Sequence, residues 1–207
     1  GNNVKTDRDV NGNISAYTYV PGTDWIETVI DPRGFQTTNG YDGVGNLTKL
    51  IRHNPAGQDE ITTYTYDPQG NRLTATDPLR HTTKYEYDAN GRLKKESDPL
   101  DPPDNGTESF YDANGNIIRR TQTRTNTDLV ADAELQVEVT TTYKYDDSDR
   151  LIEELDPHGR KTVTTYNASG KPATVTTHYG TSAYTTTNEY DARGNLFRTT
   201  YPDSSTT

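Results

Sequence analysis

The feature that most constrains this sequence is a tyrosine followed by an aspartate, which returns along the whole chain. Successive tyrosines of this kind, including those whose aspartate is replaced, are separated by 22, 25, 21, 24, 34, 21 and 24 residues. An internal period of about 20 to 50 residues is typical of repeat proteins, in which each period is one supersecondary unit. The sequence therefore predicts a single array of about eight units over residues 1–207.

Each unit contains two stretches of turn chemistry. One is Tyr-Asp-x-x-Gly, as in YDPQG at 66–70, and the other is Asp-Pro-x-Gly or a relative, as in DPRG at 31–34. In a type I turn, aspartate at the first position can accept a hydrogen bond from the N–H two residues on, proline suits the second position and glycine suits the fourth. Turns are therefore predicted at 67–70, 88–91, 112–115, 156–159 and 191–194.

The segments between the turns have the pattern of half-buried strands. They are rich in Thr, Tyr and Val and alternate with a period of two, so that Thr83, Tyr85 and Tyr87 share one face of an extended chain. The charged Lys84 and Glu86 share the other face. Because strand and turn alternate, the predicted fold is all-β, with repeated antiparallel hairpins of about 21 residues.

The recurring residues are expected to be structural, with the tyrosines mostly buried at equivalent positions of successive strands. Leu, Ile, Val and Phe supply only 32 of the 207 residues and the net charge is -10, a composition that by itself is typical of disorder. The regular spacing of the tyrosines indicates instead a folded chain whose buried layer is built largely from Tyr and Thr. The repeat residues are Tyr19, Tyr41, Asp42, Tyr66, Asp67, Gly70, Tyr87, Asp88, Gly91, Tyr111, Asp112, Gly115, Tyr145, Asp146, Tyr166, Tyr190, Asp191 and Gly194.

The motif YDxxGRL at 87–93, followed by Asp-Pro and a return to a Tyr-Asp strand, resembles the YD repeat of Rhs proteins, wall-associated proteins, insecticidal Tc toxin C components and animal teneurins. The resemblance implies that the hairpins wind side by side into a spiralling β-sheet that closes into a hollow shell. In the bacterial members this shell encloses a toxic C-terminal domain. The implied location is extracellular or at the surface of a bacterial cell.

Some positions depart from the repeat. Val20 and Asn167 stand where the aspartate is expected, and Asp149 replaces a turn glycine. An insertion at about 121–140 is interpreted as a lengthened hairpin, although residues 128–137 could instead form a short helix. The proline-rich stretch at 98–106 is predicted to be a protruding loop.

Two acidic stretches resemble cation sites, but we interpret both as solvated turns or loops. DRDVNGNI at 7–14 has part of a calcium-loop pattern, yet its closing glutamate would fall on Thr18. The other stretch contains Asp98, Asp101, Asp104 and Glu108. Neither a metal nor another cofactor is expected.

Catalysis is not predicted for this chain. Most aspartates are explained by the turns, and the four histidines lie in different units without a common Ser or Asp motif. The acidic charge without a basic stripe argues against a nucleic-acid partner. No apolar run reaches the length of a membrane span, and the absence of cysteine excludes disulfides.

Aromatic side chains leave a sugar-binding hypothesis open. Trp25, Tyr17, Tyr19, Tyr179 and Tyr184 are the candidates, and Trp25 is the aromatic residue most expected at the surface. Since the repeat tyrosines recur at fixed positions, a packing role is favoured for them.

The predicted function is that of a non-catalytic structural segment of an extracellular YD-repeat shell that encloses or presents another domain. The alternative is an adhesin or a filament-forming module that binds glycans or copies of itself. The expected partner is the rest of the same chain or an encapsulated domain. Self-association through strand edges and a glycan ligand remain open.

Both ends of the sequence fall inside a repeat, since GNNVKT at 1–6 and YPDSSTT at 201–207 each align with part of a unit. The chain is therefore expected to be a segment of a longer protein. Each terminal segment is expected to pair as a strand with only one neighbour, or with another copy of the chain, because no capping unit is recognisable.

Overall fold

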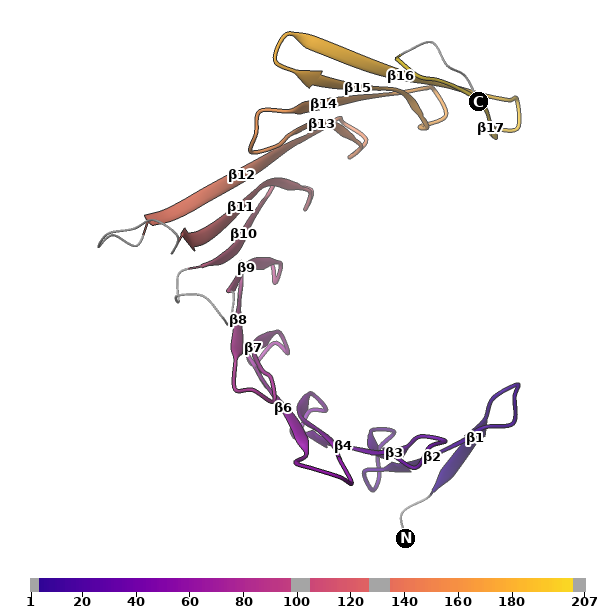
Figure 1. Cartoon of the computed structure of the whole chain (residues 1–207), viewed down its shortest axis with the longest axis vertical. Helices are drawn as coiled ribbons and strands as arrows, with labels where there is room; N and C mark the ends of the chain where they lie inside the picture. Colours follow the sequence, from indigo (N-terminus) through magenta and orange to yellow (C-terminus); the bar gives the residue numbers. More distant parts are fainter. Residues whose placement is uncertain (1–3, 98–104, 127–134, 203–207) are drawn as a thin grey trace. The chain divides into compact units, whose positions relative to one another are not determined.

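The computed structural model describes residues 4–97, 105–126 and 135–202. Throughout these residues the chain is all-β, with 17 strands and no helix, so the predicted fold of repeated antiparallel hairpins is confirmed (Figure 1). None of the described residues belongs to a helix long and apolar enough to cross a membrane. The chain divides into two compact units, residues 1–103 and 104–207.

In the first unit each strand pairs antiparallel with the next strand along the chain. The strands are β1 (Lys5–Arg8), β2 (Ile14–Tyr19), β3 (Ile26–Ile30), β4 (Gln36–Tyr41), β5 (Leu47–Arg52), β6 (Glu60–Tyr66), β7 (Arg72–Thr76), β8 (Thr82–Tyr87) and β9 (Leu93–Ser97).

The second unit follows the same rule of antiparallel pairing between consecutive strands. Its strands are β10 (Gly106–Tyr111), β11 (Ile117–Asn126), β12 (Leu135–Tyr145), β13 (Leu151–Leu155), β14 (Lys161–Tyr166), β15 (Pro172–Tyr179), β16 (Ser182–Tyr190) and β17 (Leu196–Thr200). Within the described part of each unit, β1 pairs with β2 alone and β17 pairs with β16 alone, as expected for the terminal strands.

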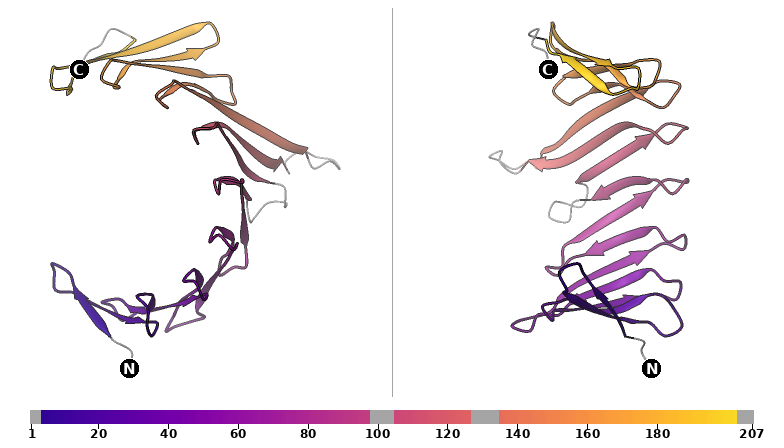
Figure 2. Two further views of the ribbon diagram at one scale, coloured as in Figure 1. Left: turned by 180° about the vertical axis from the view of Figure 1, so that it is seen from behind. Right: turned by 90° about the vertical axis from the view of Figure 1, so that its right-hand side faces the viewer.

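Since every connection reverses the chain, successive connections within a unit lie alternately at two edges of its sheet (Figure 2). We call the edge that carries the Tyr-Asp turns the tyrosine edge and the other the opposite edge. The connections of the tyrosine edge are 20–25, 42–46, 67–71 and 88–92 in the first unit and 112–116, 146–150, 167–171 and 191–195 in the second. Those of the opposite edge include 9–13, 31–35, 53–59, 77–81, 156–160 and 180–181.

The insertion forms a lengthened hairpin, as predicted. β11 and β12 pair continuously from Arg119 opposite Thr142 to Asn126 opposite Leu135. Of the alternative helix, residues 135–137 lie in β12 and the rest fall outside the described residues. The predicted loop at 98–106, with Asp98, Asp101 and Asp104, also falls outside them, except for its last two residues.

The prediction that the repeat tyrosines are mostly buried is wrong. All eight are half-buried, and none of the described hydrophobic side chains is fully buried. The physical reason is that the described residues of each unit form a single sheet, and none of them makes a second layer on its faces. The few apolar side chains are therefore shielded by their neighbours in the sheet and by the turns.

Paired threonines stabilise these sheets between the turns. At six places two threonines directly opposite each other on neighbouring strands join their hydroxyl groups, with Oγ1–Oγ1 distances of 2.6 to 3.1 Å. Each such cross-strand pair contributes about 0.2 to 1 kcal/mol relative to alanine. The pairs are Thr18–Thr28, Thr65–Thr74, Thr76–Thr82, Thr121–Thr140, Thr165–Thr174 and Thr176–Thr185.

Candidate functional site

The aspartate of each repeat organises its own turn. The carbonyl of Asp67 accepts a hydrogen bond from the N–H of Gly70 at 3.0 Å, and the N–H of Asp67 donates to the carbonyl of Asn71 at 2.9 Å. Its carboxylate accepts the N–H groups of Gln69 at 3.0 Å and Asn71 at 2.8 Å, and the Asn71 side-chain amide at 2.8 Å. We call this set of bonds the aspartate cage, because a single aspartate holds the five residues of the turn together through its main chain and its carboxylate.

The same cage recurs at both edges. In ten turns of the described part of the chain a side-chain oxygen accepts both the N–H two residues on and the N–H four residues on, and all five predicted turns belong to this group. The cages are centred on Asp9, Asp31, Asp42, Asp67, Asp88, Asp112, Asp146, Asp156, Asn167 and Asp191. The stretch that resembles a calcium loop is therefore the Asp9 turn between β1 and β2.

The sequence reading missed the fifth turn residue. In eight of the ten turns it carries an amide or a cationic group that bonds the caged carboxylate, as when Arg92 Nε donates to Asp88 at 2.7 Å. The exceptions are Phe35 in the Asp31 turn and Lys171 in the Asn167 turn. Asn, Arg or Lys follows the turn glycine in most units, and this was the available signal. Among the described residues no group of three or more His, Asp or Glu side chains could hold a metal ion.

The cages hold their carboxylates in the ionised form. The side-chain amide of Asn71 is the largest cause of the lowered pKa of Asp67, and the N–H of Arg92 is the largest for Asp88, with burial opposing both. The pKa is lowered at all nine caged aspartates, and also at Asp77, whose carboxylate accepts the N–H of His81. These groups are thus unsuited to donate a proton near neutral pH.

Positive φ at the fourth turn position explains the glycines. Gly45 has a φ of 98°, and a Cβ added there would lie 2.6 Å from Cζ2 of Trp25. The Trp25 ring also packs against Tyr41, with ring centroids 5.5 Å apart. Trp25 is half-buried, so the expectation that it is the main surface aromatic is wrong. Trp25 lies over Gly45, a turn residue that has no side chain. Because the two residues are far apart in the sequence, the residues around either of them do not indicate this contact.

The repeat tyrosine makes the contact that joins one hairpin to the next. The Tyr66 hydroxyl donates to the carbonyl of Leu47, the first residue of β5, at 2.7 Å. We call this bond the tyrosine latch. Six latches join residues of the same unit, with O–O distances of 2.7 to 3.0 Å, from Tyr41 to Ile26, Tyr66 to Leu47, Tyr87 to Arg72, Tyr145 to Ile117, Tyr166 to Leu151 and Tyr190 to Pro172.

The latch lies where the main-chain pairing stops. β5 and β6 pair from Arg52 opposite Glu60 to Lys49 opposite Thr63, so pairing ends two residues before Leu47 and three before Tyr66. All six latches have these offsets. Neighbouring hairpins therefore separate at the tyrosine edge, and a phenol is long enough to bridge the gap. Partial burial raises the pKa of the Tyr66 and Tyr145 hydroxyls, which keeps them protonated as donors.

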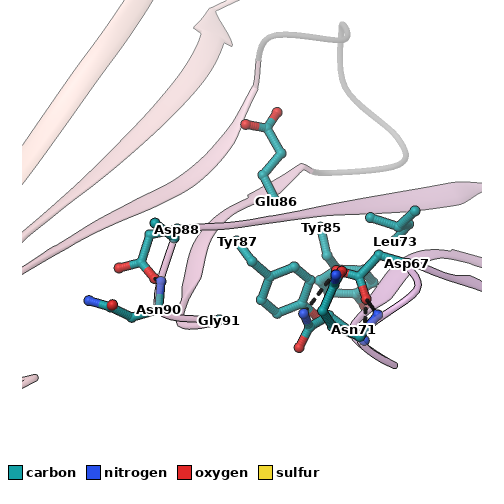
Figure 3. Close-up of a pocket in the computed structure, with 11 residues that line it drawn as sticks. Asp67, Asn71, Leu73, Tyr85, Glu86, Tyr87, Asp88, Asn90 and Gly91 are labelled. Carbon is teal, nitrogen blue, oxygen red and sulfur yellow. Dashed lines mark hydrogen bonds between the residues drawn. The ribbon is translucent and has the colours of Figure 1, made fainter.

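Figure 3 shows one such gap, a cavity of about 800 Å³ between the turns 67–70 and 88–91. Tyr85 and Tyr87 point toward the neighbouring turn, while Glu86 points away from it. The Asp67 and Asp88 carboxylates that line the cavity are both held in cages, and the carboxylate of Glu86, which also lines it, points away from the neighbouring turn. The arrangement is suited to joining hairpins and not to proton transfer.

The histidines include one contact that the sequence reading missed. His53 Nε2 lies 2.9 Å from Thr38 Oγ1, and His53 Nδ1 lies 2.9 Å from Asp59 Oδ2. Strand pairing brings His53 and Thr38 together across 15 positions of the sequence, so no local sequence motif indicated this contact. The contact ties the opposite-edge connection 53–59 to β4. The Thr38 hydroxyl also lies 3.3 Å from the side-chain amide of Gln36.

Comparisons with known proteins agree with this geometry. A family model described as the teneurin YD-shell matches residues 23–205. Within a crystal structure of TcdB2-TccC3-Cdc42, one chain superposes with a TM-score of 0.67 at 17% identity, over 90% of this chain and 12% of that one. A Photorhabdus luminescens Tc holotoxin pore gives a TM-score of 0.45 at 15% identity, over 91% of this chain and 13% of that one.

This chain thus spans about an eighth of the length of the solved chains it matches. A search of curated proteins finds no significant match. The first solved structure supports the fold, and the family model covers most of the sequence with the same Tyr-Asp units that form the latches and cages. The chain belongs to the teneurin YD-shell family, a structural shell fold.

Proposed function

We propose that this chain is a non-catalytic structural segment of an extracellular YD-repeat shell, which encloses or presents another domain. The observation that carries the proposal is the tyrosine latch, which uses the recurring tyrosines to join consecutive hairpins. The repeat aspartates are likewise engaged within their own turns. The most regular polar groups of the chain therefore serve its own architecture, and no cofactor is required.

The structural role of the repeat residues and the single array over residues 1–207 are part of this proposal. The partner is the rest of the same chain or an encapsulated domain, and the location is outside the cell or at the surface of a bacterium. The family match favours this function over an adhesin or filament module.

The test is limited proteolysis of the full-length protein that contains this segment. In the wild-type protein we expect the enclosed domain to resist a protease that digests it rapidly when it is produced alone. The double variant Tyr66→Ala and Tyr87→Ala removes two consecutive latches, so it should open the shell and shorten the lifetime of the enclosed domain.

The matched control is Tyr179→Ala and Tyr184→Ala, which removes two exposed tyrosines at the opposite edge and should leave protection unchanged. Equal digestion of the domain inside and outside the wild-type protein would refute enclosure. A domain that stays protected after the latches are removed would refute their role in closing the shell.

A further inference from the structure

The hairpin β15–β16 in the second unit is longer than its neighbours. Its strands have 8 and 9 residues, whereas β13 and β14 have 5 and 6 (Figure 1). The connection is only Gly180 and Thr181, with Gly180 at a φ of 55°. The extra length lies at the opposite edge, beyond the segment that the tyrosine latch holds, and it places Tyr179 and Tyr184 on either side of the connection.

These two tyrosines differ from the tyrosines of the repeat in their exposure. Tyr179 is 54% exposed and Tyr184 is 51% exposed, whereas the eight repeat tyrosines are half-buried. Their rings form an edge-to-face pair with centroids 6.4 Å apart. Two large exposed rings packed against each other form an apolar patch that the hairpin itself does not need for its pairing.

Polar groups from the neighbouring turn adjoin the patch. Arg160 Nη1 lies 3.3 Å from the Tyr179 hydroxyl, and its guanidinium lies 6.0 Å from the centre of that ring. Arg160 Nε also pairs with Asp156 Oδ2 at 2.9 Å, so its charge is balanced locally. Asp156, His158, Arg160 and Tyr179 line a cavity of about 250 Å³.

We propose that Tyr179, Tyr184, His158 and Arg160, together the tyrosine platform, form a binding site for a neutral saccharide. An exposed aromatic face packs against the C–H face of a pyranose ring, and nearby donors and acceptors fix the orientation of its hydroxyl groups. The balanced Arg160–Asp156 pair, on a chain with a net charge of -10, favours a neutral sugar over an anionic one.

The structure also separates the five aromatic residues that the sequence offered for sugar binding. Trp25, Tyr17 and Tyr19 are half-buried, whereas Tyr179 and Tyr184 are exposed beside a cavity with polar walls. The site does not depend on the shell function, because the platform takes no part in a latch.

The test is saturation-transfer NMR with three neutral disaccharides, cellobiose, maltose and N,N′-diacetylchitobiose, followed by titration of whichever shows transfer. We expect at least one to bind, with a Kd of about 1 mM, as is typical of a small exposed contact. Tyr179→Ala and Tyr184→Ala should each weaken binding about tenfold, which corresponds to about 1.4 kcal/mol. Tyr184→Phe should retain binding, because the ring face remains.

The matched control is Phe197→Ala, which removes a side chain that is 60% exposed on β17. This variant should bind like the wild-type chain. Absence of transfer from all three sugars would overturn the proposal, and so would equal binding by the wild-type chain and both alanine variants. The melting temperature of each variant is recorded alongside, and we expect it to be unchanged, so that a loss of binding is not a loss of fold.

Discussion

The two edges of each sheet obey different rules. At the tyrosine edge, seven of the eight connections contain five residues between the repeat tyrosine and the next strand, and the exception follows Tyr19. Among the connections of the opposite edge whose residues are all described, the lengths range from the two residues 180–181 to the seven residues 53–59. The long pairing of β11 with β12 and the tyrosine platform also extend toward the opposite edge.

The difference separates two tasks that the repeat motif combines. Aspartate cages occur at both edges, as Asp67 and Asp156 illustrate, so the cage serves to make a hairpin. All six latches lie at the tyrosine edge, so the latch serves to hold hairpins together. The connections and strands can vary in length at the opposite edge, because none of the six latches has to join neighbouring hairpins there.

Acid should have the largest effect, because it acts on the cages of both edges at once. The folded-state pKa of each caged aspartate lies below its ordinary value of about 3.9, so the cages contribute stability that is complete above this value. That stability is lost as the pH falls through the lower, folded-state values. Thermal unfolding between about pH 7 and about pH 2 should show a falling melting temperature only below about pH 4.

The amide shifts of Asn71 and Arg160, which report the Asp67 and Asp156 cages, should titrate in the same acidic range by NMR. If only one of these two amide shifts changed in that range, the view that both edges are stabilised by the same aspartate cage would be wrong. A steady loss of stability beginning near neutral pH would point to groups other than the cages.

Among single substitutions, the replacement of a tyrosine by alanine should show the largest difference in stability between the two edges. Tyr66→Ala removes a latch and a half-buried ring, so it should lower the free energy of unfolding by about 2 to 4 kcal/mol. Tyr179→Ala removes an exposed ring and should change it by less than about 0.5 kcal/mol. Urea unfolding followed by circular dichroism measures both values, and similar losses would remove the distinction between latch and platform.

Removal of the hydroxyl alone isolates the latch from the packing of its ring. Tyr66→Phe should lower the free energy of unfolding by about 0.5 to 1.5 kcal/mol, because the hydrogen bond to the Leu47 carbonyl is lost. Tyr184→Phe, which alters an exposed hydroxyl, is the matched control and should have no measurable effect. A Tyr66→Phe variant as stable as the wild-type chain would show that the phenol acts only through its ring.

The smallest effects concern two turns in which another residue replaces glycine. Arg80, at the opposite edge, has a φ of 69°, and Asp149, at the tyrosine edge, has a φ of 58°. Arg80→Gly should relieve this strain and stabilise the chain by about 1 kcal/mol. Asp149→Gly should gain less, because Asp149 Oδ1 accepts the amides of Asn114 at 2.8 Å and Asn116 at 2.6 Å from the neighbouring turn. Chemical denaturation measures the free energy of unfolding of both variants. Equal gains in this free energy would contradict a role for the bonds from Asn114 and Asn116.

The turns could be predicted from the sequence because their chemistry is local. Asp67 and Gly70 lie three residues apart, and the bonds they make depend on the turn itself. The alternation of charged residues with Thr and Tyr in β8 predicted a strand in the same way. Strand order then followed, since short connections leave antiparallel neighbours as the only simple arrangement.

The contacts between hairpins could not be predicted in this way. The acceptor of each latch is a main-chain carbonyl, so residues such as Leu47 and Arg72 share no side chain that would reveal their common role. Burial was overestimated because the tyrosines were expected to form a core, whereas a single sheet leaves them half-buried. The packing of Trp25 over Gly45 likewise depends on the approach of two turns.

The choice of a main-chain acceptor has a consequence for how such proteins evolve. The oxygen that receives the latch belongs to Ile, Leu, Arg or Pro in different units, and the bond is the same in each. The latch itself therefore requires no matching side chain in the preceding hairpin, unlike the contacts of Asp149 with Asn114 and of Trp25 with Gly45. Duplication, loss or recombination of whole units would therefore preserve the latch between them.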